Sequence, residues 1–153
     1  MKLIVACEHA GVDLRNTLVE YLREKGHDAV GYGPETDDPV DYPPIIEEAA
    51  NRVLNEGFDY GLFICGTGIG VSLAASKVPA ILPANCLNEY MARMARAHNN
   101  ANVLCLGSRV VGESLAKAIV DAFLETKFEG GRHSRRIGQV LDIEKRRAGI
   151  AKP

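Results

Sequence analysis

The stretch YGLFICGTGIGVSLAASK, residues 60–77, decides the fold that we expect for this chain. It opens with an apolar run that ends at Cys65, continues through a glycine-rich turn, and then takes up the apolar spacing that is typical of a helix. A strand, a tight turn and a helix in this order form one half of a β-α-β unit, so the stretch predicts a parallel sheet. The turn would lie at the carboxyl edge of that sheet, where open α/β proteins bind their ligands.

Further apolar runs alternate with segments of helical periodicity along the rest of the chain. This alternation predicts a parallel sheet that is covered by helices on both faces. Because Pro79 and Pro83 cannot donate hydrogen bonds to a neighbouring strand, we expect their run at or near an edge of the sheet. Asp41 and Gly112 mark two helix starts. The expected strands are 3–7, 28–33, 60–65, 79–85 and 101–107, and the expected helices are 11–25, 43–56, 69–77, 88–97, 113–126 and a basic one at 133–149.

Length and composition fit a single domain over residues 1–153, since 46% of the residues are hydrophobic and 25% are charged. The net charge of −2 gives no electrostatic reason to expect nucleic acid as a partner. The apolar runs are too short for a signal peptide or a membrane span, so we expect a cytoplasmic protein with no membrane partner. The four cysteines show neither paired nor metal-finger spacing, which predicts reduced thiols.

The glycine-rich turn has the spacing GxGxG, with glycines at 66, 68 and 70. Val71 stands where the dinucleotide fingerprint needs its last glycine, and the GK[ST] ending of a P-loop is missing. The spacing therefore leaves a strand-to-helix turn whose free N–H groups suit an anion or a developing oxyanion. Cys65 at its mouth is either a base or nucleophile, or a small residue that closes the strand, and the turn by itself favours the packing interpretation.

Polar residues follow the ends of three expected strands, and these ends should meet at one edge of the sheet. They are Glu8 and His9, Cys65 and Thr67, and Arg109. His98 and Asn99 instead precede the strand 101–107, which places them toward the opposite edge. They could join the same site only from a second subunit, which argues for a dimer, whereas His98 taken alone is equally well explained as a helix cap.

Two arginines near the C-terminus form a candidate anion clamp. Arg132 and Arg136 are four residues apart in GGRHSRRI, so they share one face of a helix, and His133 lies between them. Guanidinium groups in such an arrangement suit a phosphate. The alternative is a solvated basic helix end.

Taken together, these motifs resemble the ribose/galactose-phosphate isomerase family over about residues 2 to 140. The resemblance is carried by EHAG (8–11), VDYP (40–43), ICGTGIG (64–70), ARMARAHNNANVLCLGSRV (92–110) and FEGGRHSRRI (128–137). It implies a three-layer α/β/α Rossmann-like sandwich with a five-stranded parallel sheet and a C-terminal basic helix. It also implies a homodimer or a dimer of dimers whose sites are shared between subunits. The implied activity is the interconversion of aldose and ketose phosphates through an enediolate, with no metal and no cofactor.

Carried over by position, the resemblance assigns the reacting groups. Cys65 would be the base that moves a proton between C1 and C2 of the sugar, and Thr67 would help to move the hydroxyl proton. His98 would open the sugar ring. The amides of the turn that contains Gly66, Gly68 and Gly70 would hold the enediolate oxygen.

The resemblance also assigns the groups that hold the substrate, a sugar phosphate. Glu8, Tyr42 and Asn99 would contact the sugar. The phosphate would be bound by His9, Arg109, Arg132 and Arg136.

The chain departs from the family's usual residues at several positions, and these leave the substrate open. Glu8 replaces the usual aspartate, Ser76 replaces an asparagine, Leu82 replaces an arginine, and Leu87 and Asn88 replace a His-Asp pair. D-Ribose 5-phosphate and D-ribulose 5-phosphate are the leading pair. An isomerase of another sugar phosphate, a tetrose phosphate or a hexose phosphate such as allose or galactose 6-phosphate, is the first alternative. A sugar-phosphate-binding protein without activity is the second.

Overall fold

The computed structural model describes residues 1–148, in which strands and helices alternate as the sequence predicts. The strands are β1 (Lys2–Cys7), β2 (Asp28–Tyr32), β3 (Tyr60–Cys65), β4 (Pro83–Asn85) and β5 (Val103–Gly107). The helices are α1 (Val12–Glu24), α2 (Tyr42–Asn55), α3 (Ile69–Ala75), α4 (Glu89–Ala97), α5 (Glu113–Glu125) and α6 (Arg132–Ala148). A short 3-10 helix, η1 (His9–Gly11), follows β1 and is an addition to the predicted elements.

The five strands form one parallel sheet in the order β2-β1-β3-β5-β4. Residues of β1, β3 and β5 are almost all buried, because helices cover both faces of the sheet. The chain runs from β1 outward to β2 and then returns to β3 on the other side of β1. The carboxyl ends of β1 and β3 therefore flank the topological switch point, where doubly wound sheets bind their ligands.

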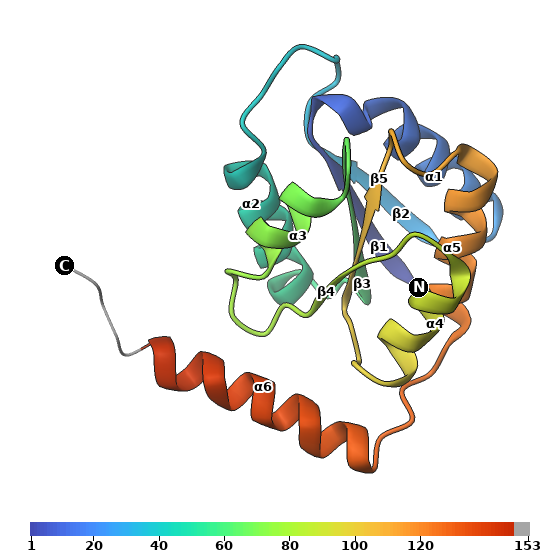
Figure 1. Ribbon diagram of the computed structural model, residues 1–153. Helices are drawn as coiled ribbons and strands as arrows, with labels where there is room; N and C mark the ends of the chain where they lie inside the picture. Colours follow the sequence, from blue (N-terminus) through green and yellow to red (C-terminus); the bar gives the residue numbers. More distant parts are fainter. Residues whose placement is uncertain (149–153) are drawn as a thin grey trace.

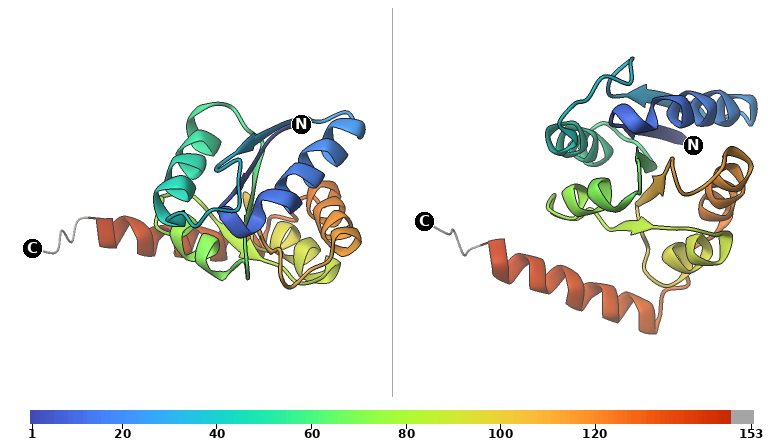
Figure 2. Two further views of the ribbon diagram at one scale, coloured as in Figure 1. Left: turned by 90° about the horizontal axis from the view of Figure 1, so that it is seen from above. Right: turned by 45° about the horizontal axis from the view of Figure 1, so that its top comes forward.

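The helices form two layers, one on each side of the sheet (Figures 1 and 2). Helices α1, α4 and α5 cover one face, where Leu18 and Ile119 are fully buried. Helices α2 and α3 cover the other face, where Ile46 and Val71 are fully buried. The predicted three-layer α/β/α sandwich is confirmed.

The fourth strand is shorter than its sequence suggests. The apolar run predicts residues 79–85, but the strand covers only Pro83–Asn85, since Ala80 has a positive φ of 67° and belongs to a turn after α3. Pro79 and Pro83 remove two backbone donors, which limits how much of the run can pair. The predicted edge position is confirmed, because β4 pairs only with β5.

Helix α6 lies outside the two helical layers and runs along the β4 side of the molecule (Figure 1). Glu144 on α6 accepts a hydrogen bond from the Ala80 amide at 3.0 Å. An apolar groove of about 650 Å³ separates α6 from the segment around β4, and its walls include Ile81 and Val140. The predicted helix to residue 149 and the predicted domain to residue 153 both extend beyond the described residues.

The helix starts at Asp41 and Gly112 are confirmed, since both residues precede helices as N-caps. Among residues 1–148, no helix has the length and apolar character needed to cross a bilayer.

The central strands should dominate stability. Leu104 of β5 is fully buried, so we expect Leu104→Ala to lower the free energy of unfolding by ~2–5 kcal/mol. Leu54→Ala on the exposed side of α2 is the matched control and should change it by less than about 0.5 kcal/mol. Urea denaturation at one fixed protein concentration measures both, and equal effects of the two variants would contradict this packing.

Candidate active site

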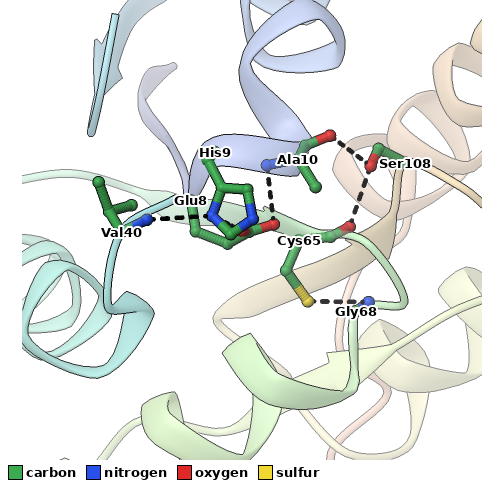
Figure 3. Close-up of polar contacts among 7 residues, drawn as sticks. All are labelled: Glu8, His9, Ala10, Val40, Cys65, Gly68 and Ser108. Atoms are coloured by element: carbon green, nitrogen blue, oxygen red, sulfur yellow. Dashed lines mark hydrogen bonds and ion pairs between the residues drawn. The ribbon is translucent and has the colours of Figure 1, made fainter. Parts of the chain in front are cut away.

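The turn between β3 and α3 brings a thiol and a backbone donor together. Cys65 is the last residue of β3, and the Gly68 amide donates a hydrogen bond to its Sγ at 3.1 Å (Figure 3). Gly68 reaches this position with a φ of +78°, which residues with a side chain rarely adopt. The Thr67 hydroxyl accepts a hydrogen bond from the Ile69 amide at 3.3 Å. The thiolate form of a cysteine is the one that acts as a base, and the Gly68 N–H points at the sulfur that would carry its charge.

Neighbouring strands hold this turn in place. A Cβ at Gly107, the last residue of β5, would lie 2.6 Å from the Thr67 carbonyl carbon, so only glycine lets the two segments approach so closely. The Asn85 side chain of β4 donates to the Thr67 carbonyl at 3.4 Å. Ser108 donates to the Ala10 carbonyl at 2.6 Å and also contacts the Cys65 carbonyl at 3.3 Å. Ser108 thus joins the segments after β1, β3 and β5.

Glu8 and His9 form a second polar pair after β1. Glu8 is buried and accepts a hydrogen bond from the Ala10 amide at 3.1 Å. Its other carboxylate oxygen lies 2.5 Å from Nδ1 of His9, and the Val40 amide lies 3.3 Å from the same nitrogen (Figure 3). One ring nitrogen cannot donate to the carboxylate and accept from the amide, so we assign a proton on Nδ1 from the shorter contact. This leaves Nε2 of His9 for a ligand.

These groups line one pocket of about 260 Å³ at the carboxyl edge of the sheet. The side chain of Arg109 packs over Gly66, and that of Tyr42 packs over Gly70. The pocket is lined by Glu8, His9, Ala10, Tyr42, Cys65, Gly66, Thr67, Gly70 and Arg109. The structure thus gathers the site residues that the sequence placed at strand ends, and it places Gly68 in the turn below them.

The loop between β2 and α2 reaches the same edge of the sheet (Figure 1). Its anchor is the buried Arg15 of α1, which donates to the Pro34 carbonyl at 2.6 Å and lies 3.6 Å from the Glu35 carboxylate. Sequence reasoning missed Arg15 and Ser108. An arginine on the apolar face of a predicted helix was the available signal for Arg15, whereas nothing in the sequence distinguished Ser108 from other serines.

Four predicted site residues lie elsewhere: His98, Asn99, Arg132 and Arg136. His98 caps the C-terminus of α4, and the two arginines belong to the first turns of α6, at the end of the sheet opposite to the β3–α3 turn (Figure 1). Within one chain they do not line the pocket around Cys65. The predicted separation of His98 from the strand ends is therefore observed.

His98 belongs to a second cluster, formed with Glu129, Arg132 and His133. The imidazole rings of His98 and His133 are stacked, with centroids 4.2 Å apart and an interplanar angle of 4°. Glu129 lies 3.7 Å from Nε2 of His98 and 3.6 Å from Nε2 of His133. Arg132 donates from Nε to Nε2 of His133 at 3.4 Å. Burial is the main cause that lowers the pKa of His133, and the charges of its neighbours His98 and Arg132 lower it further.

The same cluster holds the three side chains that could share a metal ion among residues 1–148. His98, Glu129 and His133 offer ligand atoms within 4.8 Å of one another. The two imidazole planes are parallel, however, so their lone pairs do not converge on one point. The nitrogen of His133 also accepts from a guanidinium, whose positive charge opposes a cation there. The geometry of these three side chains is therefore unfavourable for a metal ion.

The other thiols are packing residues. All four cysteines are free, and burial raises the pKa of Cys7 and of Cys86 to about 11. Burial also raises the pKa of Cys105 well above its usual value. Cys65 alone among the four lines the pocket.

The departures from the family's usual residues mostly lie outside this pocket. Ser76 caps the end of α3, Asn88 caps the start of α4, and Leu82 lines the groove beside α6. Leu87 is exposed. Only Glu8 contacts the pocket of its own chain.

Comparison with known proteins agrees with this geometry. The family described as Ribose/Galactose Isomerase matches residues 3–140. Ribose-5-phosphate isomerase B of Escherichia coli (strain K12) is 42% identical over 146 residues, which cover 95% of this chain and 98% of the relative. The D-erythrulose-4-phosphate isomerase of Pectobacterium atrosepticum is 36% identical over 142 residues, covering 92% and 93% of the two chains. The solved structure of ribose-5-phosphate isomerase B from Clostridium thermocellum has a TM-score of 0.93 at 44% identity, covering 95% of this chain and 99% of that one.

Fold, pocket and relatives together define a sugar-phosphate isomerase. The chain belongs to the Ribose/Galactose Isomerase family.

The environment of the thiols predicts selective modification. We expect iodoacetamide to label Cys65 at least about tenfold faster than the other three cysteines, because it alone lines a pocket and receives a hydrogen bond at sulfur. Peptide mapping by mass spectrometry of the native chain over time measures the four rates. In urea the four rates should converge, and faster native labelling of Cys86 would contradict the assignment.

Proposed function

We propose that this enzyme interconverts D-ribose 5-phosphate and D-ribulose 5-phosphate with Cys65 as the base. The observation that carries the proposal is the hydrogen bond from the Gly68 amide to the Cys65 sulfur, inside a pocket that also holds a carboxylate, a histidine and an arginine. Removal of a proton next to a carbonyl needs a base of this kind and donors for the negative charge that develops on oxygen.

The proton transfer proceeds on the open-chain sugar. The Cys65 thiolate takes the proton from C2 of the aldose, the electron pair forms the C1–C2 double bond, and the negative charge moves to the oxygen on C1. The thiol then returns the proton to C1. A proton passes from the hydroxyl oxygen on C2 to the oxygen on C1, with Thr67 placed beside the sulfur to assist it, and a ketose results.

The remaining pocket residues hold the two ends of the substrate. Backbone N–H groups of the turn around Gly68 stabilise the enediolate oxygen, as an oxyanion hole does. Glu8 and Tyr42 contact the sugar hydroxyls. His9 and Arg109 lie where the phosphate would enter, and the guanidinium charge of Arg109 suits a dianion.

The complete site needs a second chain. The end of α4 and the start of α6 lie at the opposite end of the sheet from the β3–α3 turn (Figure 1). The partner would therefore supply His98, Asn99, Arg132 and Arg136. Exposed apolar side chains on α3 and α4 support an interface, since Ile69 and Leu73 of α3 and Tyr90 of α4 are 56%, 56% and 71% exposed. A homodimer, or a dimer of dimers, would bury them and complete two equivalent sites.

The role of His98 favours a substrate that forms a ring. Ribose 5-phosphate closes a furanose through the oxygen on C4, and a histidine can move the protons that open it. An aldotetrose 4-phosphate cannot close this ring, because its C4 oxygen carries the phosphate. An isomerase for tetrose phosphates would therefore have no use for a ring-opening residue, which ranks the tetroses below the pentose. A hexose 6-phosphate remains the alternative, with Glu8 as the residue that could reset the length of the sugar site.

Two variants separate proton transfer from ring opening. Ribulose 5-phosphate is an open-chain ketose, since its C5 oxygen carries the phosphate, so deuterium exchange at its C1 needs the base but no ring opening. We expect Cys65→Ala to lower both isomerisation and C1 exchange by about 10²–10⁴-fold. We expect His98→Asn to lower isomerisation of ribose 5-phosphate while C1 exchange stays within about threefold of the unmodified enzyme. NMR of the deuterated ketose and a coupled isomerisation assay provide the two rates.

Binding of ribitol 5-phosphate, which has no carbonyl, serves as the control and should survive in Cys65→Ala. C1 exchange that persists in Cys65→Ala would place the base elsewhere. Turnover of a hexose 6-phosphate but of no pentose phosphate would mean that the substrate is a hexose phosphate, while the proposed proton transfer by Cys65 would still hold.

A mixture of the two inactive variants tests the shared site. In a heterodimer of Cys65→Ala and His98→Asn chains, one site carries both defects and the other carries none. After unfolding and refolding together in equal amounts, the mixture should recover about one quarter of the unmodified activity, because half of the dimers are mixed and each has one intact site. Cys65→Ala refolded with Cys65→Ser should recover nothing. An absence of recovery in the first mixture would mean that one chain supplies both residues.

A further inference from the structure

The histidine between the two clamp arginines has contacts that the proposed mechanism leaves unused. His133 is buried, with an exposed fraction of 7%, and its neighbours in sequence, Arg132 and Ser134, are exposed. Its ring stacks on His98 and its Nε2 accepts from Arg132. A buried polar side chain is expected to satisfy its hydrogen bonds, and here one ring nitrogen does so through Arg132, a group of the proposed site.

We propose that His133 is a positioning residue that orients both the ring-opening His98 and the phosphate-binding Arg132. The proposal rests on the proposed function, which gives those two residues their roles. His133 itself would touch neither the sugar nor the phosphate.

The backbone explains why His133 occupies this place. The Glu129 amide donates to the Ala97 carbonyl at 3.0 Å, which ties the segment before α6 to the end of α4. Gly130 and Gly131 follow with φ values of +69° and +57°, and they turn the chain into α6. The first turn of α6 therefore lies under the C-cap of α4, where His98 stands.

The stacking holds His98 from one side only. The side chain of His98 is 36% exposed and that of His133 is 8% exposed. The buried ring of His133 therefore covers one face of the His98 ring, and the other face of His98 stays free. Parallel rings 4.2 Å apart restrict the tilt of the outer ring. His98 can then present a nitrogen to a substrate in a defined direction.

The hydrogen bond fixes the tautomer of His133. Nε of a guanidinium is always a donor, and Nε2 of His133 lies 3.4 Å from it and 3.6 Å from the Glu129 carboxylate. From the shorter contact we assign an unprotonated Nε2 and a proton on Nδ1. The lowered pKa of His133 agrees with a neutral ring at neutral pH. Four charged or titratable groups face this ring, namely His98, Glu129, Arg132 and Arg136. Arg132 is exposed, and this bond restrains a guanidinium that would otherwise sample many rotamers.

Two substitutions separate the two contacts. His133→Phe keeps a flat ring under His98 but cannot accept from Arg132, whereas His133→Gln keeps an acceptor near the position of Nε2 but cannot stack. We expect His133→Phe to weaken ribitol 5-phosphate binding by about three- to tenfold and to leave the kcat for ribose 5-phosphate within about twofold. We expect His133→Gln to leave that affinity within about twofold and to lower the kcat by about three- to tenfold, with C1 exchange of ribulose 5-phosphate within about twofold.

Calorimetry gives the affinity, and the isomerisation and exchange assays give the rates. If His133 only supported folding, both substitutions would lower affinity and kcat in the same way, so equal losses in the two variants, or no loss in either, would overturn the proposal.

The nitrogen chemical shifts of His133 in the unmodified enzyme give a test that needs no variant to fold. They should show the proton on Nδ1, and a proton on Nε2 would overturn the contact with Arg132. If the unmodified enzyme acts on no ribose 5-phosphate, the proposed function fails, while the tautomer and the ribitol 5-phosphate affinities still decide the role of His133.

Discussion

The hydrogen bond between the Gly68 amide and the Cys65 sulfur depends on the way three strands end at one edge of the sheet. Cys65 must close β3, Gly68 must adopt a left-handed conformation, and Gly107 must have no side chain so that β5 can pass beside Thr67. Each of these conditions is local, yet together they fix the one thiol of the pocket relative to a backbone donor. The other residues of the pocket surround this thiol.

The sequence predicted the fold well because the signals were periodic and local. The alternation of apolar runs and amphipathic segments specified the parallel sheet, and prolines 79 and 83 specified the edge strand. The predicted length of that strand was wrong, because the run 79–82 has the composition of a strand but contains a turn with Ala80 at positive φ. The apolar composition of a run does not show whether its backbone N–H groups have hydrogen-bond partners in a neighbouring strand.

The site divides into a predictable and an unpredictable part. Residues that follow parallel strands meet by topology, so the order of the strands in the sequence was enough to place Glu8, His9, Cys65 and Arg109 together. Contacts such as those of Arg15 with Pro34, or of Ser108 with Ala10, join segments far apart in sequence through single hydrogen bonds. No periodicity marks such contacts. The stacking of His98 on His133 has the same character, since it depends on a turn made by two glycines outside any regular element.

The division of the proposed site between the two ends of the sheet has a consequence for the catalytic rate. If each reaction centre needs the pocket of one chain and the histidine cluster of another, an isolated chain is inactive by geometry, however well it folds. Activity per chain would then fall on dilution once the concentration approaches the dissociation constant of the dimer. Substrate bound across both chains would oppose that dissociation, so the sugar phosphate would act as a cross-link between subunits as well as a reactant.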